Sequence, residues 1–143
     1  MNEAVGSAFV FKWIIIFLFL IMFLLFGSLL YTRTFKIRNE VITIIEQQKG
    51  WNATAQSNID SFLGNVGYRR KQNYRHNVCP DYEGWERQNT DSSPYFYCIY
   101  SKDGSNYYRV TIYMYLDLPV VGDFIQFPVS GDTRNFRNWA DWQ

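Results

Sequence analysis

The spacing of hydrophobic positions changes twice along this chain, and each stretch predicts a different element. Residues 13–31 read WIIIFLFLIMFLLFGSLLY and contain no charged side chain. As a helix this segment would be roughly 29 Å long, close to the roughly 30 Å hydrocarbon core of a bilayer. Because lipid offers no partner to unpaired backbone groups, a helix is the expected conformation. Trp13 and Tyr31 stand at its two ends, where amphipathic rings favour the membrane interface.

A cleaved secretory signal is the alternative interpretation of this run. Its apolar stretch is longer than a usual signal core, and no A-x-A-like site follows it. Lys12 is the one basic side chain before it. We therefore predict an uncleaved, single-pass anchor, with processing near Gly6 or Ala8 as the other possibility.

A helical pattern continues beyond the apolar run. Ile37, Val41, Ile44 and Ile45 recur at i, i+4, i+7 and i+8, so they share one helix face. Neither Pro nor Gly interrupts residues 29–49, which predicts one continuous helix from about residue 8 to residue 49, ended by Gly50.

A second, shorter helix is predicted from one further apolar face, formed by Ala55, Ile59, Phe62, Leu63 and Val66. Asn52 or Thr54 can serve as its N-cap. Gly64 and Gly67 are expected to end it.

From residue 68 onward the hydrophobic period falls to two residues, which indicates strands. Asp103-Gly104 predicts a two-residue hairpin turn. In that register Ile99 lies opposite Tyr108 and Tyr97 lies opposite Val110, on the face that we assign to the core.

Cys98 falls on the other face of this hairpin, opposite Arg109. In an oxidising compartment Cys98 and Cys79 would form a disulfide contributing on the order of 3 kcal/mol. That bond would hold the loop at residues 77–94 across the outer side of the sheet. In a reducing compartment both would be ordinary thiols.

A last pair of short or edge strands is predicted at residues 117–122 and 124–129. Pro119 and Pro128 cannot donate to a ladder, which favours edge positions. Residues 130–132, Ser-Gly-Asp, are expected to form a turn.

These elements predict an α+β fold: a long N-terminal transmembrane helix that continues into an amphipathic helix, a short second helix, and a small antiparallel sheet of about four strands. The expected division is an N-terminal leader or flank at 1–12, a transmembrane helix at 13–31, an extramembrane helical region at 32–67, and an antiparallel β domain with a C-terminal tail at 68–143. Because an isolated hairpin is not stable, the apolar faces of both helices should cover the sheet.

The side of the membrane is indicated by conflicting signals. Arg33, Lys36 and Arg38 follow the apolar run, against Lys12 before it, and this favours a cytoplasmic domain. The paired cysteines and the aromatic, strand-rich domain favour the outside, as does the glycosylation sequon at residues 52–54. We predict an extracytoplasmic domain.

One segment, residues 68–76, concentrates positive charge and reads YRRKQNYRH, although the whole chain carries only +1. A solvent-facing strand is the simplest interpretation. Contact with an acidic protein surface or anionic lipid is the next, and single-stranded nucleic acid is the least favoured. The candidate partner-binding residues are Arg69, Arg70, Lys71, Tyr74 and Arg75.

Catalysis finds little support in the sequence. His76 is the single histidine, the cysteines lack C-x-x-C spacing, and no glycine-rich phosphate loop is present. Asp81, Glu83 and Glu86 could bind a divalent ion, but a solvated acidic loop is the favoured interpretation. We predict no enzymatic activity, no cofactor and no metal.

This layout resembles that of type IV pilins and pseudopilins, including minor pilin-like proteins of tight-adherence systems. The resemblance covers residues 8–116 and is one of layout: a membrane helix with an amphipathic continuation, then an antiparallel sheet with a disulfide. It implies assembly through the apolar helix, with pilin-like or other envelope subunits or further copies as partners. The family's leader is usually basic and its mature helix usually carries a fifth-position glutamate. Here Met1–Gly6 is not basic, and Phe11 takes that position after a cut at Gly6. The resemblance therefore implies a membrane-resident relative.

Overall fold

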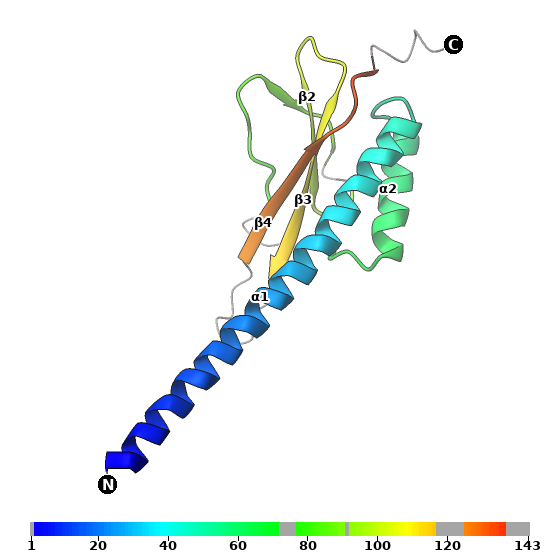
Figure 1. Ribbon diagram of the computed structural model, residues 1–143. Helices are drawn as coiled ribbons and strands as arrows, with labels where there is room; N and C mark the ends of the chain where they lie inside the picture. Colours follow the sequence, from blue (N-terminus) through cyan, green and yellow to red (C-terminus); the bar gives the residue numbers. More distant parts are fainter. Residues whose placement is uncertain (1, 72–76, 91, 117–124, 137–143) are drawn as a thin grey trace. The chain divides into compact units, whose positions relative to one another are not determined.

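The computed structural model describes residues 2–71, 77–90, 92–116 and 125–136 (Figure 1). The chain divides into two compact units, Met1–Arg33 and Thr34–Gln143. The described residues form two helices followed by four strands: α1 (Asn2–Gln47), α2 (Ala53–Asn65), β1 (Trp85–Arg87), β2 (Tyr97–Lys102), β3 (Tyr108–Leu116) and β4 (Ile125–Asp132). The strands form one antiparallel sheet in the order β1-β2-β3-β4. The predicted α+β class is confirmed.

The first unit is helical, and its side chains are exposed along most of the apolar run. Every side chain from Phe9 to Phe26 is exposed to the surroundings. Because a helix pairs its backbone groups internally, such an element suits hydrocarbon better than water. Within the described residues, one helix is long and apolar enough to cross a membrane, and it is α1.

Both helices end in backbone geometry that the sequence specifies in part. The left-handed residue after α1 is Lys49, with φ of 56°, rather than the glycine that follows it. The Asn52 side chain caps α2 by accepting a hydrogen bond from the Ala55 N–H at 2.7 Å. Gly67 follows α2 with φ of 66°, and the Tyr68 N–H donates to the Leu63 carbonyl at 2.8 Å. This is a glycine-terminated helix end.

Gly64 does not terminate α2, contrary to the prediction. It lies inside the helix, and a Cβ added there would be 2.8 Å from the Tyr95 hydroxyl. Its lack of a side chain therefore lets Tyr95 pack against the helix.

The β2–β3 hairpin has a register that differs by two residues from the predicted one. Ile99 lies opposite Val110, and Tyr97 lies opposite Ile112. A shift of two residues keeps every side chain on its own face, since side chains alternate with a period of two. The core-face assignment is therefore correct although the pairing was not.

The turn chemistry explains this shift. The Ser105 N–H donates to the Lys102 carbonyl at 3.0 Å, so residues 102–105 form a turn. Gly104 has φ of 73°, whereas Asp103 is not in the left-handed region, which is the pattern of a type II turn. A type II turn does not match the twist of paired strands. The chain therefore uses residues 103–107 before β3 begins.

β4 pairs with β3 along its whole length, from Leu116 opposite Ile125 to Arg109 opposite Asp132. The predicted turn at residues 130–132 is wrong, because these residues continue β4. The bidentate Arg109–Asp132 pair, at 2.7 and 3.0 Å, holds them in the ladder. The predicted strand at 117–122 lies outside the described residues.

The outer edge of β4 lacks one donor and has one occupied acceptor, in agreement with the predicted edge position of a strand with proline. The Thr133 N–H donates to the Tyr108 carbonyl, and alternation along the ladder then places the Pro128 nitrogen on the outer side. Arg38 of α1 donates to the Ser130 carbonyl at 2.7 Å. Proline and arginine therefore hinder strand addition at these two positions.

The main core lies between the helices and one face of the sheet, as Figure 1 shows for α1 and α2. Ile37, Val41 and Ile45 of α1 are buried here, whereas Ile44 is only partly buried. The other buried members are Ile59, Leu63, Tyr68, Tyr95, Tyr97, Ile99, Val110 and Ile112. The predicted covering of the sheet by both helices is confirmed.

Ile45→Asp is expected to unfold the second unit, because an unpaired carboxylate in this core costs about 4 kcal/mol or more. Near-ultraviolet circular dichroism and thermal unfolding of the full chain in detergent measure this effect. Ile44→Asp should cost clearly less. Membrane insertion of both variants, measured by carbonate extraction, should be unchanged. A native melting curve for Ile45→Asp would refute the packing.

Candidate functional site

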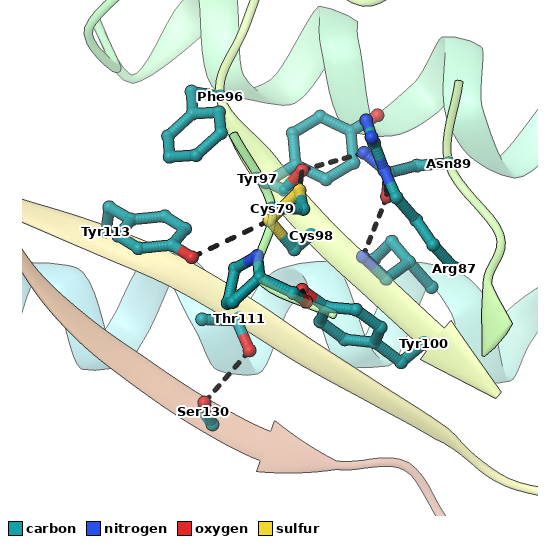
Figure 2. The surroundings of a disulfide bond; sticks show 12 residues. Cys79, Arg87, Asn89, Phe96, Tyr97, Cys98, Tyr100, Thr111, Tyr113 and Ser130 are labelled. Atoms are coloured by element: carbon teal, nitrogen blue, oxygen red, sulfur yellow. Dashed lines mark hydrogen bonds between the residues drawn. A yellow bond between two sulfur atoms is a disulfide. The ribbon is translucent and has the colours of Figure 1, made fainter. Parts of the chain in front are cut away.

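A second, smaller cluster lies on the sheet face that points away from the helices. Its buried members are Cys79, Phe96, Cys98, Tyr100 and Tyr113. Figure 2 shows these side chains around the disulfide. The outer face of the sheet is thus partly a hydrophobic core of its own.

Cys79 and Cys98 form the predicted disulfide, with Cα atoms 5.8 Å apart. Cys98 lies on the predicted face but opposite Thr111 rather than Arg109, because of the register shift. Both cysteines are buried. The bond therefore attaches the 77–94 segment to the middle of the sheet.

Aromatic contacts enclose the sulfur atoms. The Phe96 and Tyr113 rings stack with centroids 4.5 Å apart, and the Tyr113 hydroxyl lies 3.7 Å from Cys98 Sγ. The Tyr100 hydroxyl donates to the Pro80 carbonyl at 2.7 Å. The disulfide and these aromatic contacts thus hold the same 77–94 segment against β2.

Asn89 extends the short edge strand β1 with its side chain. Its Nδ2 donates to the Tyr97 carbonyl at 2.7 Å, and its Oδ1 accepts from the Ile99 N–H at 3.0 Å (Figure 2). The Gln88 N–H donates to the Ile99 carbonyl at 2.8 Å. The edge of β2 is therefore paired beyond the end of β1. This role of Asn89 was not predicted from the sequence, because no local pattern distinguishes this asparagine from a loop residue.

Tyr68 completes the opposite end of the β2–β3 pair from within the core. Its hydroxyl lies 3.0 Å from the Phe96 carbonyl and 3.1 Å from the Tyr113 carbonyl, and it accepts from the Tyr113 N–H at 3.2 Å. Burial raises the pKa of Tyr68 well above its usual value. The phenol therefore stays neutral and serves as a structural connector.

The outward surface near β1 combines aromatic rings and an ion pair. The Arg109 guanidinium lies 4.2 Å from the centroid of the Trp85 ring and pairs with Asp132. Tyr107 packs edge-on against Trp85 at 5.8 Å. The hydrogen bond to Asp132 raises the pKa of Arg109. Such a mixed aromatic and charged surface is typical of protein-binding faces.

The predicted basic segment is only partly within the described residues. Arg70 forms an isolated antiparallel bridge with Tyr95, rather than part of a strand. The Arg69 guanidinium lies 5.5 Å from the centroid of the Tyr115 ring, and the Lys71 N–H donates to a backbone carbonyl at 2.7 Å. Tyr74, Arg75 and His76 lie outside the described residues.

No group of three His, Cys, Asp or Glu side chains that could hold a metal ion occurs in the part of the chain that the structure describes. Asp81, Glu83 and Glu86 are each exposed. The predictions of no metal, no cofactor and no catalysis remain predictions.

Comparison of this chain with protein-family models, with curated proteins and with solved structures finds no significant match.

The buried tyrosines predict alkaline unfolding. Burial raises the pKa of Tyr113 to about 12, and it raises that of Tyr68 as well. A folded-state pKa above the unfolded value of about 10 gives stability that is complete below pH 10 and declines as the pH rises toward 12. Urea unfolding at stepwise pH values measures this decline. Tyr113→Phe should make it shallower, and an equal slope for both proteins would contradict this assignment.

The disulfide is expected to be oxidised in protein taken directly from cells. Alkylation of unreduced, freshly lysed cells followed by mass spectrometry measures this state. Reduction should cost on the order of 3 kcal/mol. It should increase hydrogen exchange mainly in the 77–94 segment, since the helix-side core does not contain the bond. Two fully alkylated cysteines would contradict an extracytoplasmic domain.

Proposed function

We propose that this chain is a non-enzymatic, single-pass envelope protein of pilin-like or pseudopilin-like design that assembles through its N-terminal helix. In this proposal α1 anchors the chain uncleaved in the membrane, and the second unit lies outside the cytoplasm. Its partners are further copies of the chain or other pilin-like envelope subunits.

The observation that carries the proposal is the contrast between the two parts of α1. From Phe9 to Phe26 its side chains are exposed, whereas Ile37, Val41 and Ile45 are buried in the core of the second unit. One helix thus offers an unpartnered apolar surface and also belongs to a folded domain. Helices with such a surface associate in lipid by side-chain packing.

The second unit supports the same proposal by its layout. An antiparallel meander covered on one face by α1, with a disulfide on the other face, agrees with the resemblance described above. The disulfide favours an oxidising compartment. Because Met1–Gly6 is not basic and Phe11 stands in place of the family's glutamate, we propose a membrane-resident relative rather than a major filament subunit.

The alternative function is that of a bitopic accessory or receptor-like subunit that binds a protein partner through its soluble domain. The mixed surface formed by Trp85, Tyr107, Arg109 and Asp132 favours this alternative. The two functions differ in which part of the chain makes the contact.

Replacing residues 14–30 with an unrelated apolar helix of equal length tests the proposal. Trp13 and Tyr31 are kept so that the interface anchors do not change. Two differently tagged copies are expressed together and recovered from membranes in mild detergent. The native copies should co-purify, and the exchanged copies should not, because packing between specific apolar side chains is lost.

The matched control leaves the helix intact and changes the domain surface by Arg109→Gln together with Trp85→Gln. This control should co-purify as the native chain does. Co-purification that survives the helix exchange but is lost in the control would refute assembly through α1 and favour the accessory function.

A further inference from the structure

The direction of α1 within the second unit identifies which end of the sheet lies beside Thr34, the residue at which this unit begins. Arg38 donates to the Ser130 carbonyl at 2.7 Å, and Glu46 accepts from the Arg134 N–H at 2.8 Å. The helix therefore runs along β4 in the same direction as the strand. Within the second unit, residues 34–37 of α1 therefore lie toward the end of the sheet where β3 finishes and β4 begins (Figure 1).

Basic side chains gather at this Leu116 end. Arg70 bridges Tyr95 just before β2 begins, and Arg69 lies against Tyr115, next to Leu116. We call four basic residues at this end the proximal basic group: Arg69, Arg70, the adjacent Lys71, and Lys36 near the start of the unit's helical part. Arg70 and Lys36 are exposed, and Arg69 and Lys71 are half-buried.

Exposed apolar side chains accompany this charge. Phe127 of β4 is 45% exposed and Phe35 of α1 is 38% exposed. Val78 is 70% exposed, and the neighbouring Asn77 accepts a hydrogen bond from Gln126. Gln126 and Phe127 point to opposite faces of the sheet, so Val78 and Phe127 share its Leu116 end rather than one face. Basic and apolar side chains at one end of a domain are the combination that membrane interfaces favour.

Chain continuity places this end near lipid. The apolar run ends at Tyr31 and the second unit begins at Thr34. Lys36 therefore follows Tyr31 by roughly 8 Å of helical rise. Chain continuity alone therefore keeps Thr34, where the second unit begins, within a few residues of the end of the apolar run.

We propose that the proximal basic group, with Phe35, Val78 and Phe127, forms a docking surface for anionic lipid headgroups of the bilayer that holds α1. Lysine and arginine contribute charge attraction, and the exposed apolar side chains enter the interface. Lipid is favoured over a soluble partner because the anchor holds this surface beside headgroups at high local concentration. The inference rests on anchoring by α1 and not on assembly through it.

The test uses the full chain in nanodiscs at one chain per disc, in neutral phosphatidylcholine or in phosphatidylcholine with phosphatidylglycerol. An environment-sensitive NBD dye is attached to the new thiol of the Phe127→Cys variant. The dye labels this position alone, because both native cysteines are in the disulfide. In anionic discs the NBD emission should shift to the blue and be quenched by nitroxide lipids. Neutral discs should show a much smaller shift. The same dye at Asp103→Cys, in the β2–β3 loop, should report water in both.

Charge removal supplies the matched comparison. The shift should be abolished by the triple variant Arg69→Gln, Arg70→Gln and Lys71→Gln. Each basic side chain near an anionic surface raises the binding constant about five-fold, so three together contribute on the order of 100-fold. Lys49→Gln, Arg87→Gln and Lys102→Gln remove equal charge elsewhere and should leave it intact. In the native chain, about 1 M NaCl should also abolish it, because the Debye length is then about 3 Å.

Several outcomes would overturn the proposal. Equal NBD emission from the native chain in neutral and anionic discs would do so. An equal loss of the blue shift in both triple variants would do so as well. A shift that requires two chains per disc would assign the surface to a second copy, and one produced by a single-stranded oligonucleotide in neutral discs would assign it to nucleic acid. A chain that fails to co-elute with discs would instead refute the anchor, which is a separate failure.

Discussion

The burial of β2 on both faces is the constraint on which the second unit depends. Tyr97, Cys98, Ile99 and Tyr100 are consecutive and all buried. A strand alternates its side chains between two faces, so each face needs its own cover. The helices supply one cover, and the disulfide-linked 77–94 segment supplies the other. Neither cover replaces the other, because the two clusters have no buried side chain in common, although the half-buried Tyr115 packs against both.

Tyrosine suits a thin, two-sided domain of this kind. Its ring fills a core, and its hydroxyl can replace a missing backbone partner. Tyr68 does this between β2 and β3, and Tyr100 does so at Pro80. Asn89 plays the same part at the edge of β2 with an amide. No buried side-chain nitrogen or oxygen lacks a hydrogen-bond partner in the described part of the chain.

The edges of the sheet bear on how the chain meets partners. Pro128 removes one donor and Arg38 occupies one carbonyl on the outer side of β4, while β1, Gln88 and Asn89 cover β2. At these positions a partner strand has less backbone to pair with. The proposed contacts use side-chain surfaces: the apolar side chains of α1, the aromatic surface around Trp85, and the basic end of the second unit. The proposed assembly through α1 and the proposed lipid docking use separate surfaces, so the two proposals are compatible in one molecule.

The sequence by itself determined the elements and their faces, because hydrophobic periodicity reports which side of an element avoids water. It predicted the apolar helix and the amphipathic face of Ile37, Val41, Ile44 and Ile45, of which Ile44 is only partly buried. It also predicted Asn52 or Thr54 as the cap of α2, of which Asn52 is the one used, and the placement of Cys98 away from the helix-side core. It did not determine the hairpin register, which depends on the φ values of Asp103 and Gly104. Nor did it reveal that Gly64 and Gly131 make room for Tyr95 and Arg38, although both glycines resemble terminators. Contacts between residues distant in sequence decided these features, and local pattern carries no record of which distant side chain will need the space.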